Sequence, residues 1–475
     1  MRNVIKAGLT ASIGLIGSAA AQTSDEAQLS LVAGYKAAFT CSATFNAGRP
    51  VEQIAGDELT RIYPGYVDAM AAMPDAVIDE EAKTVSVSFS DKLPPRISAW
   101  RPHLGCTQLP TGADIAVKED LPQVKLSATD FAAIANEPWP KGDKVGATDI
   151  TESEEGRALK AVINAGFDGE TYGNGSETTA VLVVVDGEII AEQYRDGFDP
   201  TTPQRTWSVA KSIAASMIGA AVEDGLIDVK EPAGLAVWST PGDPRGAITL
   251  ENLLHMSSGL TSSAAGNRTD DVYFGGGRVV DHALDNRLVA KPGIRWRYAN
   301  NDTMIAVRAL REKIGKDKKF HAYAFKKLLH PLGMHHTFLE TDWNGDFVMS
   351  SQVWTTARDL ARLGLLYLNN GVWEGARILP EDWAAYVATP SPDQPTDRRE
   401  GENRPGYGAQ FWLFGERHNL PEGTYAAMGN RGQYLMIIPS RNMLVIRRGF
   451  DGRPGRNFNI SKFTADVIGA IPEER

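Results

Sequence analysis

A serine and a lysine three residues apart are the first residues in this sequence whose types and spacing suggest chemistry. The segment that starts at Ser208 has apolar residues at helical spacing: Val209, Ile213, Met217 and Ala220. We therefore expect Ser208 and Lys211 to share one face of a helix, one turn apart. A hydroxyl is a weak nucleophile near neutral pH, and a lysine can act as its base when desolvation lowers the lysine pKa. The pair predicts nucleophilic catalysis at a helix start, where backbone N–H groups favour negative charge. As an alternative, the serine is only a helix cap.

A tyrosine and an asparagine further along the chain have side chains that could complete such a site. Tyr298-x-Asn300 follows the turn-forming pair Pro292-Gly293. A phenol beside a serine and a lysine can relay protons, and an asparagine amide can hold both the lysine and a substrate carbonyl group. The Tyr-x-Asn pattern also begins at Tyr172 and Tyr367. The Pro-Gly turn distinguishes Tyr298 from these two.

A third segment, Gly429-Asn430-Arg431-Gly432-Gln433, opens a late strand-like run. Together with Ser208-x-x-Lys211 and Tyr298-x-Asn300, in this order, it resembles the three motifs of the serine β-lactamase and penicillin-binding-protein superfamily. The branch that it resembles contains class C β-lactamases, related esterases, D-alanyl-D-alanine peptidases and 6-aminohexanoate-dimer (nylon oligomer) hydrolases. Leu253–Leu260 is similar to a further landmark of this branch, and the resemblance extends from about Ser176 to Ile471.

The resemblance implies an acyl-enzyme mechanism that uses no metal and no organic cofactor. Ser208 would attack a carbonyl group, while Lys211 and Tyr298 would share the work of general base and general acid. Asn300 would orient Lys211 and the substrate. The backbone N–H of Ser208 and one from the late strand, at Gln433, would form the oxyanion hole. Whether Lys211 or Tyr298 takes the serine proton stays open.

The third segment departs from the pattern of the superfamily. Many members have Lys-Thr-Gly or His-x-Gly where this chain has Asn430-Arg431-Gly432. Without that lysine, recognition of a penicillin carboxylate is not implied, and Arg431 is either a cation in a different geometry or a solvated loop residue. We expect Asn430, Arg431, Gly432 and Gln433 to line the substrate site. The run Gly-x-x-Gly-Gln-Tyr resembles the nylon-oligomer hydrolases more than true β-lactamases.

The surrounding sequence predicts the elements that position these residues. Four strands are expected as two pairs: Ala180–Val185 with Glu188–Tyr194, and Gln433–Ile438 with Met443–Arg447. Asp186-Gly187 is typical of a two-residue hairpin turn, while Ala357–Tyr367 and Phe458–Ile471 are helical in pattern. Strands at both ends of a mostly helical segment predict an α+β fold in which the first and last strands are neighbours. The resemblance implies the β-lactamase/DD-peptidase-like fold for this domain, residues 150–475.

The chain before this domain predicts a second, smaller unit. Glu137–Gly142 is rich in proline and turn residues, as in a stiff linker. Apolar residues alternate with serines over Val85–Ser90, which predicts a half-buried strand, and Asp57–Ile62 is helical in pattern. We therefore assign residues 22–140 to an accessory α+β domain, in which we find no catalytic constellation.

The first 21 residues predict a signal peptide. Arg2 and Lys6 precede a short apolar run that ends in Ala19-Ala20-Ala21, a pattern that signal peptidase accepts. A buried N-terminal helix is the alternative. Export to the periplasm or the exterior would let a disulfide persist, so we predict a bond between Cys41 and Cys106, unless they are two unrelated thiols. This bond would close a loop of about 65 residues, a constraint worth roughly 4 kcal/mol.

The composition excludes several classes of function. The 475 residues include 49 Lys+Arg and 59 Asp+Glu, a net charge of −10, which argues against nucleic acid or anionic lipid as a partner. No later apolar run reaches about 18 residues, so we expect no membrane span in the mature chain. Only two cysteines are present, too few for cysteine-rich zinc modules.

We therefore predict an exported serine hydrolase that cleaves amide or ester bonds of small-molecule substrates. One alternative is a β-lactamase or D-alanyl-D-alanine carboxypeptidase. An alternative from another class is a non-catalytic penicillin-binding-like sensor or binding domain. The sequence does not indicate an oligomeric state.

Overall fold

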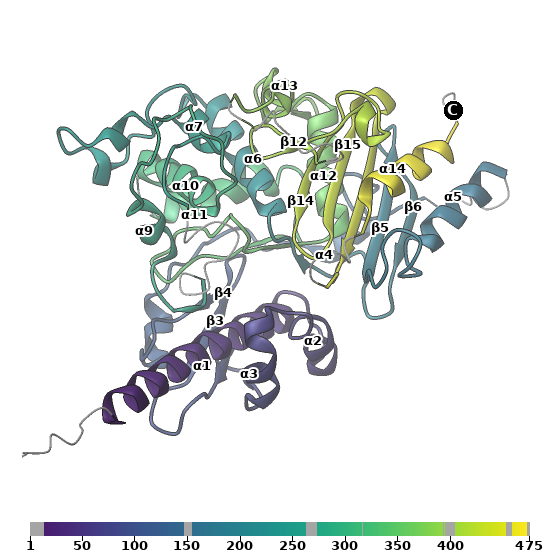
Figure 1. Ribbon diagram of the computed structural model, residues 1–475. Coiled ribbons are helices and arrows are strands. Elements are labelled where there is room, and N and C mark those ends of the chain that lie inside the picture. The colour runs from purple at the N-terminus through teal and green to yellow at the C-terminus, as the bar shows by residue number, and fades with distance from the viewer. Residues whose placement is uncertain are drawn as a thin grey trace, which may run out of the picture.

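A seven-stranded antiparallel sheet is the centre of the larger part of the molecule in the computed structural model (Figure 1). The structure describes residues 14–146, 154–262, 273–315, 317–392, 394, 404–452 and 458–472. The strand order is β12-β13-β14-β15-β16-β5-β6. In chain order these strands are β5 (Thr178–Val185), β6 (Glu188–Tyr194), β12 (Gly406–Tyr407), β13 (Trp412–Leu413), β14 (Tyr425–Gly429), β15 (Gln433–Ile438) and β16 (Met443–Gly449).

The pairing of this sheet confirms the α+β architecture predicted from the sequence. β16 lies antiparallel beside β5, with Val445 opposite Val183, so the first and last strands are neighbours. The predicted β5–β6 hairpin turns at Asp186 and Gly187, whose φ angles are 51° and 85°. Two successive positive φ angles are the signature of the type I′ turn that Asp-Gly favours.

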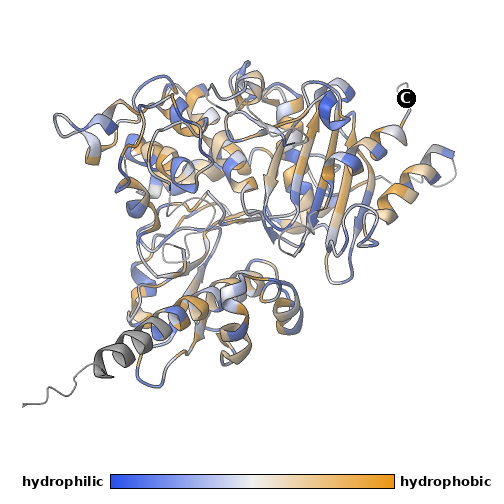
Figure 2. Ribbon diagram, viewed as in Figure 1, coloured by the Kyte–Doolittle hydropathy of each residue, from blue (hydrophilic) through white to orange (hydrophobic). Residues whose placement is uncertain are grey.

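Helices cover both faces of the sheet because its strands are apolar on both sides (Figure 2). Leu182 and Leu444 face an apolar layer that includes α6 (Val209–Glu223) and α12 (Ala357–Leu368). Val183 and Val445, one residue along each strand, face the opposite layer. Two helices cover that opposite layer: α5 (Glu154–Ala165) and α14 (Ile460–Gly469). This alternation follows from the period of two along a strand.

A helical region beside the sheet contains the Leu253–Leu260 and Tyr298-x-Asn300 segments. Its helices are α7 (Leu250–Leu254), α9 (Val279–Leu284), α10 (Asn300–Ile314) and α11 (Asp317–Ala324). A three-stranded sheet of order β7-β9-β8 joins β7 (Gln204–Arg205), β9 (Val353–Thr355) and β8 (Phe338–Leu339). Shorter elements are β10 (Val372–Trp373), β11 (Ala376–Arg377) and α13 (Trp383–Ala388). Because α10 packs on α6, the segments of Tyr298 and Ser208 lie close together.

The N-terminal part forms its own layer of helices and strands (Figure 1). Its helices are α1 (Gly14–Phe45), α2 (Val51–Asp57) and α3 (Val67–Ala72). Its sheet has the order β1-β2-β3-β4, made of β1 (Val77–Asp79), β2 (Thr84–Val87), β3 (Arg96–Arg101) and β4 (Gly105–Gln108). The next α-helix, α4 (Phe131–Asn136), lies beside the larger part, where Phe131 contacts His336 (Figure 1). Of the predicted signal peptide, residues 1–13 lie outside the described residues, and residues 14–21 belong to the first turns of α1.

Two local predictions for this part need correction. The helix predicted at Asp57–Ile62 is wrong, because α2 ends at Asp57 and Arg61 has a φ of 52°, which a right-handed helix does not allow. The predicted alternation over Val85–Ser90 is realised only as far as Val87, where β2 ends.

Polar contacts and a disulfide bond fix the N-terminal part. Cys41 and Cys106 are joined by a disulfide between α1 and β4. Glu340, from the larger part of the molecule, accepts hydrogen bonds from Ser42 Oγ at 2.6 Å, Asn46 Nδ2 at 3.0 Å and Cys106 N at 3.2 Å. Burial raises the pKa of Glu340 to about 7. The two parts are therefore in direct contact through buried polar groups.

The stretch that was expected to act as a linker is docked on the larger part. Arg362, on α12, donates hydrogen bonds to the carbonyl oxygens of Pro140 and Gly142 and pairs with Asp143 at 2.7 Å.

Within the described residues, no helix is both long and apolar enough for a membrane span.

Candidate active site

Ser208 and Lys211 meet at the start of α6. Ser208 occupies the position before the helix, and Lys211 Nζ lies 3.1 Å from Ser208 Oγ. The lysine also donates hydrogen bonds to Asn300 Oδ1 and to the Ser350 carbonyl oxygen, both at 2.7 Å. The side chain is only 1% exposed, and burial lowers its pKa to about 7. Near neutral pH, a large fraction of Lys211 is therefore the neutral amine that a base requires.

The partners of Lys211 also fix the direction of its lone pair. A neutral amine has two N–H donors and one lone pair, whereas a backbone carbonyl oxygen can only accept. If Asn300 Oδ1 and the Ser350 carbonyl take the two N–H groups, the remaining tetrahedral position of Nζ faces Ser208 Oγ. This arrangement lets the lysine accept the serine proton.

Tyr298 lies on the other side of the serine. Its phenol is hydrogen-bonded to Ser208, and burial, opposed by that hydrogen bond, raises the pKa of Tyr298 well above its ordinary value. Lys211 Nζ lies 5.0 Å from the centre of its ring. The segment is extended at Ala299 and becomes α10 at Asn300, so Tyr298 and Asn300 reach the same serine–lysine pair.

The hairpin between β14 and β15 forms the wall opposite α10. Gly429 ends β14, and a Cβ atom there would overlap the Thr206 carbonyl oxygen and lie 3.1 Å from Ser208 N. Only glycine permits this close approach of two backbones. The backbone N–H groups of Ser208 and Asn430 have no acceptor among the described residues. They are available to an oxygen of a bound substrate.

Of the remaining residues of the third motif, Arg431 and Gly432 border the pocket, whereas Gln433 does not. Gln433 Nε2 donates to the carbonyl oxygens of Arg431 and Gly449, and its Oε1 accepts from Arg448 Nε at 2.7 Å. These contacts give the Gln433 side chain a structural role at the start of β15. Gly432, with a φ of 80°, completes the turn and borders the pocket.

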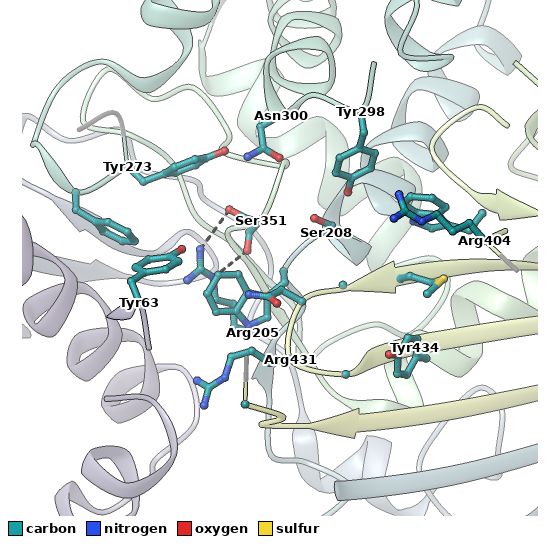
Figure 3. A pocket seen from close by; sticks show the side chains of 18 of the residues that line it. Tyr63, Arg205, Ser208, Tyr273, Tyr298, Asn300, Ser351, Arg404, Arg431 and Tyr434 are labelled. Atoms are coloured by element: carbon teal, nitrogen blue, oxygen red, sulfur yellow. Dashed lines mark hydrogen bonds between the residues drawn. The ribbon is translucent and has the colours of Figure 1, made fainter. Parts of the chain in front are cut away.

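Arg431 is neither a solvated loop residue nor directed at Ser208. It is 6% exposed, and its Nη2 donates a hydrogen bond of 2.8 Å to the carbonyl oxygen of Asp57. Figure 3 shows its side chain pointing away from Ser208 and toward the N-terminal helices. Arg431 thus fastens the β14–β15 turn to the N-terminal part.

These residues surround a cavity of about 720 Å³ (Figure 3). Ser208, Tyr298 and Asn300 lie in its wall together with many aromatic rings: Tyr63, Trp207, Tyr273, Phe274, Trp296, Trp412 and Tyr434. Tyr63 comes from the N-terminal part, and Arg205, Ser351 and Arg404 add polar groups. Sequence reasoning missed Tyr63, Arg205 and the Ser350 carbonyl. Only Arg205 had a local signal, its position three residues before the serine.

The chemistry available in this cavity is nucleophilic and acid–base. The described residues contain no group of three or more His, Cys, Asp or Glu side chains that could hold a metal ion. They do bring together a hydroxyl, a lysine with a lowered pKa, a neutral phenol and two unused N–H groups. This set meets the requirements of acyl transfer: an activated nucleophile, a proton donor and stabilisation of an oxyanion.

Comparisons with known proteins relate the chain to hydrolases. The family model described as Beta-lactamase matches residues 167–447. A 6-aminohexanoate-dimer hydrolase of Paenarthrobacter ureafaciens is 25% identical over 288 residues, which cover 57% of this chain and 72% of that protein.

Solved structures share the fold. A family VIII carboxylesterase has a TM-score of 0.54 at 15% identity, covering 67% of this chain and 98% of the other. A penicillin-binding protein homologue from Caulobacter crescentus has a TM-score of 0.51 at 14% identity, with coverage of 67% and 98%. The matching family region begins after the N-terminal part, so Tyr63 lies outside it.

Proposed function

Because this chain belongs to the Beta-lactamase family, within the serine β-lactamase and penicillin-binding-protein superfamily, we propose that it hydrolyses amide or ester bonds of small substrates through an acyl-enzyme on Ser208. The observation that carries the proposal is the buried Lys211 amine, held 3.1 Å from Ser208 Oγ by two hydrogen-bond acceptors. A module that only binds has no need of such a base, and burying an amine that ordinarily carries a charge is costly.

In the acylation step, Ser208 Oγ attacks the substrate carbonyl carbon and passes its proton to Lys211 Nζ. Lys211 rather than Tyr298 acts as the base, because Tyr298 keeps its proton throughout the neutral range. The carbonyl oxygen becomes an oxyanion, which accepts hydrogen bonds from the N–H groups of Ser208 and Asn430. We assign the second donor to Asn430 instead of Gln433, because Asn430 borders the cavity beside Ser208.

The leaving group then departs with a proton. The Tyr298 phenol, in contact with Ser208, donates its proton to the leaving nitrogen or oxygen and regains one from the Lys211 ammonium group. A water molecule next attacks the acyl-enzyme carbonyl carbon, with Lys211 accepting its proton. Collapse of this second intermediate returns a proton to Ser208 Oγ and releases the carboxylic acid.

The substrates proposed are linear amides or esters rather than penicillins. The relative that acts on 6-aminohexanoate dimers and the carboxylesterase of the same fold support this choice. The third motif also lacks the lysine common in β-lactamases, and Arg431 is turned toward Asp57.

The domain division and the localisation extend this proposal. We propose that residues 22–140 are an accessory domain attached to the hydrolase domain of residues 150–475, and that residues 1–21 direct export to the periplasm or exterior. The disulfide between Cys41 and Cys106 supports an oxidising compartment. The mass of the protein recovered from the producing cells tests this. Loss of the first 21 residues is expected, and an intact N-terminus in the cytoplasm would contradict it.

The reaction is tested with the purified protein and three substrates: p-nitrophenyl acetate, a linear 6-aminohexanoate dimer and nitrocefin. We expect turnover of the first two and labelling of Ser208 by a fluorophosphonate. Ser208→Ala should abolish both, whereas Ser212→Ala, one turn further along α6, should keep both. Fast nitrocefin hydrolysis would favour a β-lactamase. An unlabelled wild-type protein that turns over no substrate would refute the proposal.

A further inference from the structure

Arg205 is a buried cation in the wall of the active-site cavity that the proposed reaction does not use. It lies three residues before Ser208, borders the same cavity and is 4% exposed. Its guanidinium group lies against two adjacent rings, 3.9 Å from the centre of Trp207 and 4.5 Å from that of Phe39. Figure 3 shows it on the side of the cavity where Tyr63 and the N-terminal helices lie.

The hydrogen bonds of this guanidinium group are incomplete. Nε donates to the Ser351 carbonyl oxygen at 3.1 Å and Nη2 to Ser351 Oγ at 3.2 Å. Nη1 has no acceptor, and no carboxylate of the described residues lies within 4.0 Å of the group. Two carboxyl groups are close enough to act on Arg205, Glu340 and Glu58. Glu340 accepts hydrogen bonds from Ser42 and Asn46, and Glu58 is paired with Arg49 at 2.8 Å.

A second buried arginine, away from the cavity, has all of its nitrogen atoms hydrogen-bonded. Arg448 is 1% exposed and likewise has no carboxylate partner, but each of its three nitrogen atoms is bonded. Nε donates to Gln433 Oε1, Nη1 to the Thr355 carbonyl oxygen and Nη2 to the Gln204 carbonyl oxygen. Arg448 does not border the cavity, whereas Arg205 does. Arg96 Nε and Arg101 Nε also lack an acceptor among the described residues, but neither arginine borders the cavity. Arg431, which does border it, is turned toward Asp57. Arg205 therefore combines an unused nitrogen with a place beside the nucleophile.

The described part of the cavity wall contains no acidic residue to balance this charge. Among the described residues that line it, three are arginines (Arg205, Arg404 and Arg431) and none is Asp or Glu, although the whole chain has a net charge of −10. A buried guanidinium group without an anion is unfavourable, and an anion that enters the cavity would relieve it. A single negative charge, as on a carboxylate, matches the single charge of Arg205, whereas a phosphate monoester carries nearly two.

We propose that Arg205 anchors a carboxylate subsite, so that the preferred substrates are amides or esters that carry a carboxylate on the portion directed toward Tyr63. The identity of the substrates rests on the proposed function. Binding of a carboxylate at Arg205 can be measured without any reaction. The competing account is that Arg205 is structural and only joins Phe39 of the N-terminal part to the segment before Ser208.

The test compares matched substrates that differ in one carboxylate. One pair places it in the acyl part: mono-p-nitrophenyl adipate and p-nitrophenyl hexanoate. The other pair places it in the leaving group: 4-acetoxybenzoate and its methyl ester. In the wild-type protein, we expect the carboxylate member of one pair to have a kcat/KM at least about 30-fold higher, as for a buried charge pair. In Arg205→Met, that ratio should fall toward one.

Arg448→Met is the matched control, because it also removes a buried guanidinium group. It should lower stability while the carboxylate preference persists. If Arg205→Met does not fold, Arg205→Lys takes its place, and its ratio should fall because lysine lacks the guanidinium fork. Equal kcat/KM values within both wild-type pairs would overturn the subsite, as would a preference that survives the substitution of Arg205.

A binding measurement separates failure of the subsite from failure of the proposed reaction. Calorimetry on Ser208→Ala protein compares adipate monoamide, which carries a carboxylate, with neutral adipamide. Tighter binding of the monoamide, lost in Ser208→Ala/Arg205→Met, would support the subsite even if no ester is hydrolysed. Equal binding of the two ligands would refute it, whatever the activity.

Discussion

Replacement of Asn300 by aspartate tests whether Lys211 is the base, because it changes one atom of the side chain and adds a charge. Asn300 Oδ1 lies 2.7 Å from Lys211 Nζ, and both residues are buried. In Asn300→Asp a carboxylate takes this place, accepts the same hydrogen bond and stabilises the ammonium form of the lysine. The substitution should therefore raise the pKa of Lys211.

The expected size of the effect follows from the starting value. Burial lowers the pKa of Lys211 to about 7, so about half of it is neutral at pH 7. An opposite charge at contact distance moves a pKa by roughly 1–3 units. With a midpoint near pH 9, about 1% of the lysine would be neutral at pH 7, which lowers kcat/KM about 50-fold there. Much of this loss should disappear by pH 10.

The assay is the pH dependence of kcat/KM for p-nitrophenyl acetate, which reports the titration of the free enzyme. Wild-type activity should rise with pH, with a midpoint about 7, and the midpoint of Asn300→Asp should lie one to three units higher. The control is Asn301→Asp, whose side chain faces the Thr261 carbonyl oxygen instead of Lys211. It should keep the wild-type midpoint. Asn300→Asp activity that is reduced by the same factor at every pH would refute Lys211 as the titrating base.

Three further predictions concern other groups of the structure. Tyr298→Phe should lower kcat about 10²–10³-fold without moving the midpoint near pH 7, and a shifted midpoint would mean that the phenol titrates in this range. Gly429→Ala should lower kcat/KM at least about 100-fold, because its Cβ overlaps the Thr206 carbonyl oxygen and displaces the hairpin from Ser208; wild-type kinetics would show that the hairpin has no part in the reaction. Burial raises the pKa of Glu340 from 4.5 to about 7. Between pH 4.5 and about 7, the Glu340 carboxyl group is therefore protonated in the folded protein and ionised in the unfolded chain. The free energy of unfolding consequently falls as the pH rises through this range. Glu340→Gln should therefore raise the free energy of unfolding, measured by urea denaturation, by up to about 3 kcal/mol at pH 8 and by less at pH 5. An equal gain at both pH values would contradict the raised pKa of Glu340.

The sequence predicted the parts of the fold that depend on local patterns. A two-residue hairpin turn requires positive φ angles, which Asp186-Gly187 tolerates better than most residue pairs. This turn therefore identified the strands on either side of it, β5 and β6. Ser208 and Lys211 were placed correctly because helix geometry alone brings residues three apart together. The acceptors that hold the Lys211 amine at Ser208, Asn300 Oδ1 and the Ser350 carbonyl oxygen, come from distant segments.

Predictions failed where long-range contacts decide the structure. The segment after α2 has a helical pattern, but a positive φ at Arg61 takes it out of the helix. The sequence suggested Gln433 for the oxyanion site. In the structure, Gln433 is already paired with Gly429 in the sheet, and Asn430, the first residue of the β14–β15 turn, borders the cavity. Tyr63 could not be found, because only packing of the N-terminal part brings it to the cavity.

The pairing of β5 with β16 has a consequence for how the chain is made. All eight residues of β5 are buried in the finished protein, and their partner strand begins only at Met443. During synthesis the apolar β5–β6 hairpin therefore waits, with one edge unpaired, until almost the whole chain has emerged. An unpaired apolar edge is a site of aggregation. Chains that terminate before Met443 should consequently be insoluble or depend on chaperones, even though they contain Ser208, Lys211 and Tyr298.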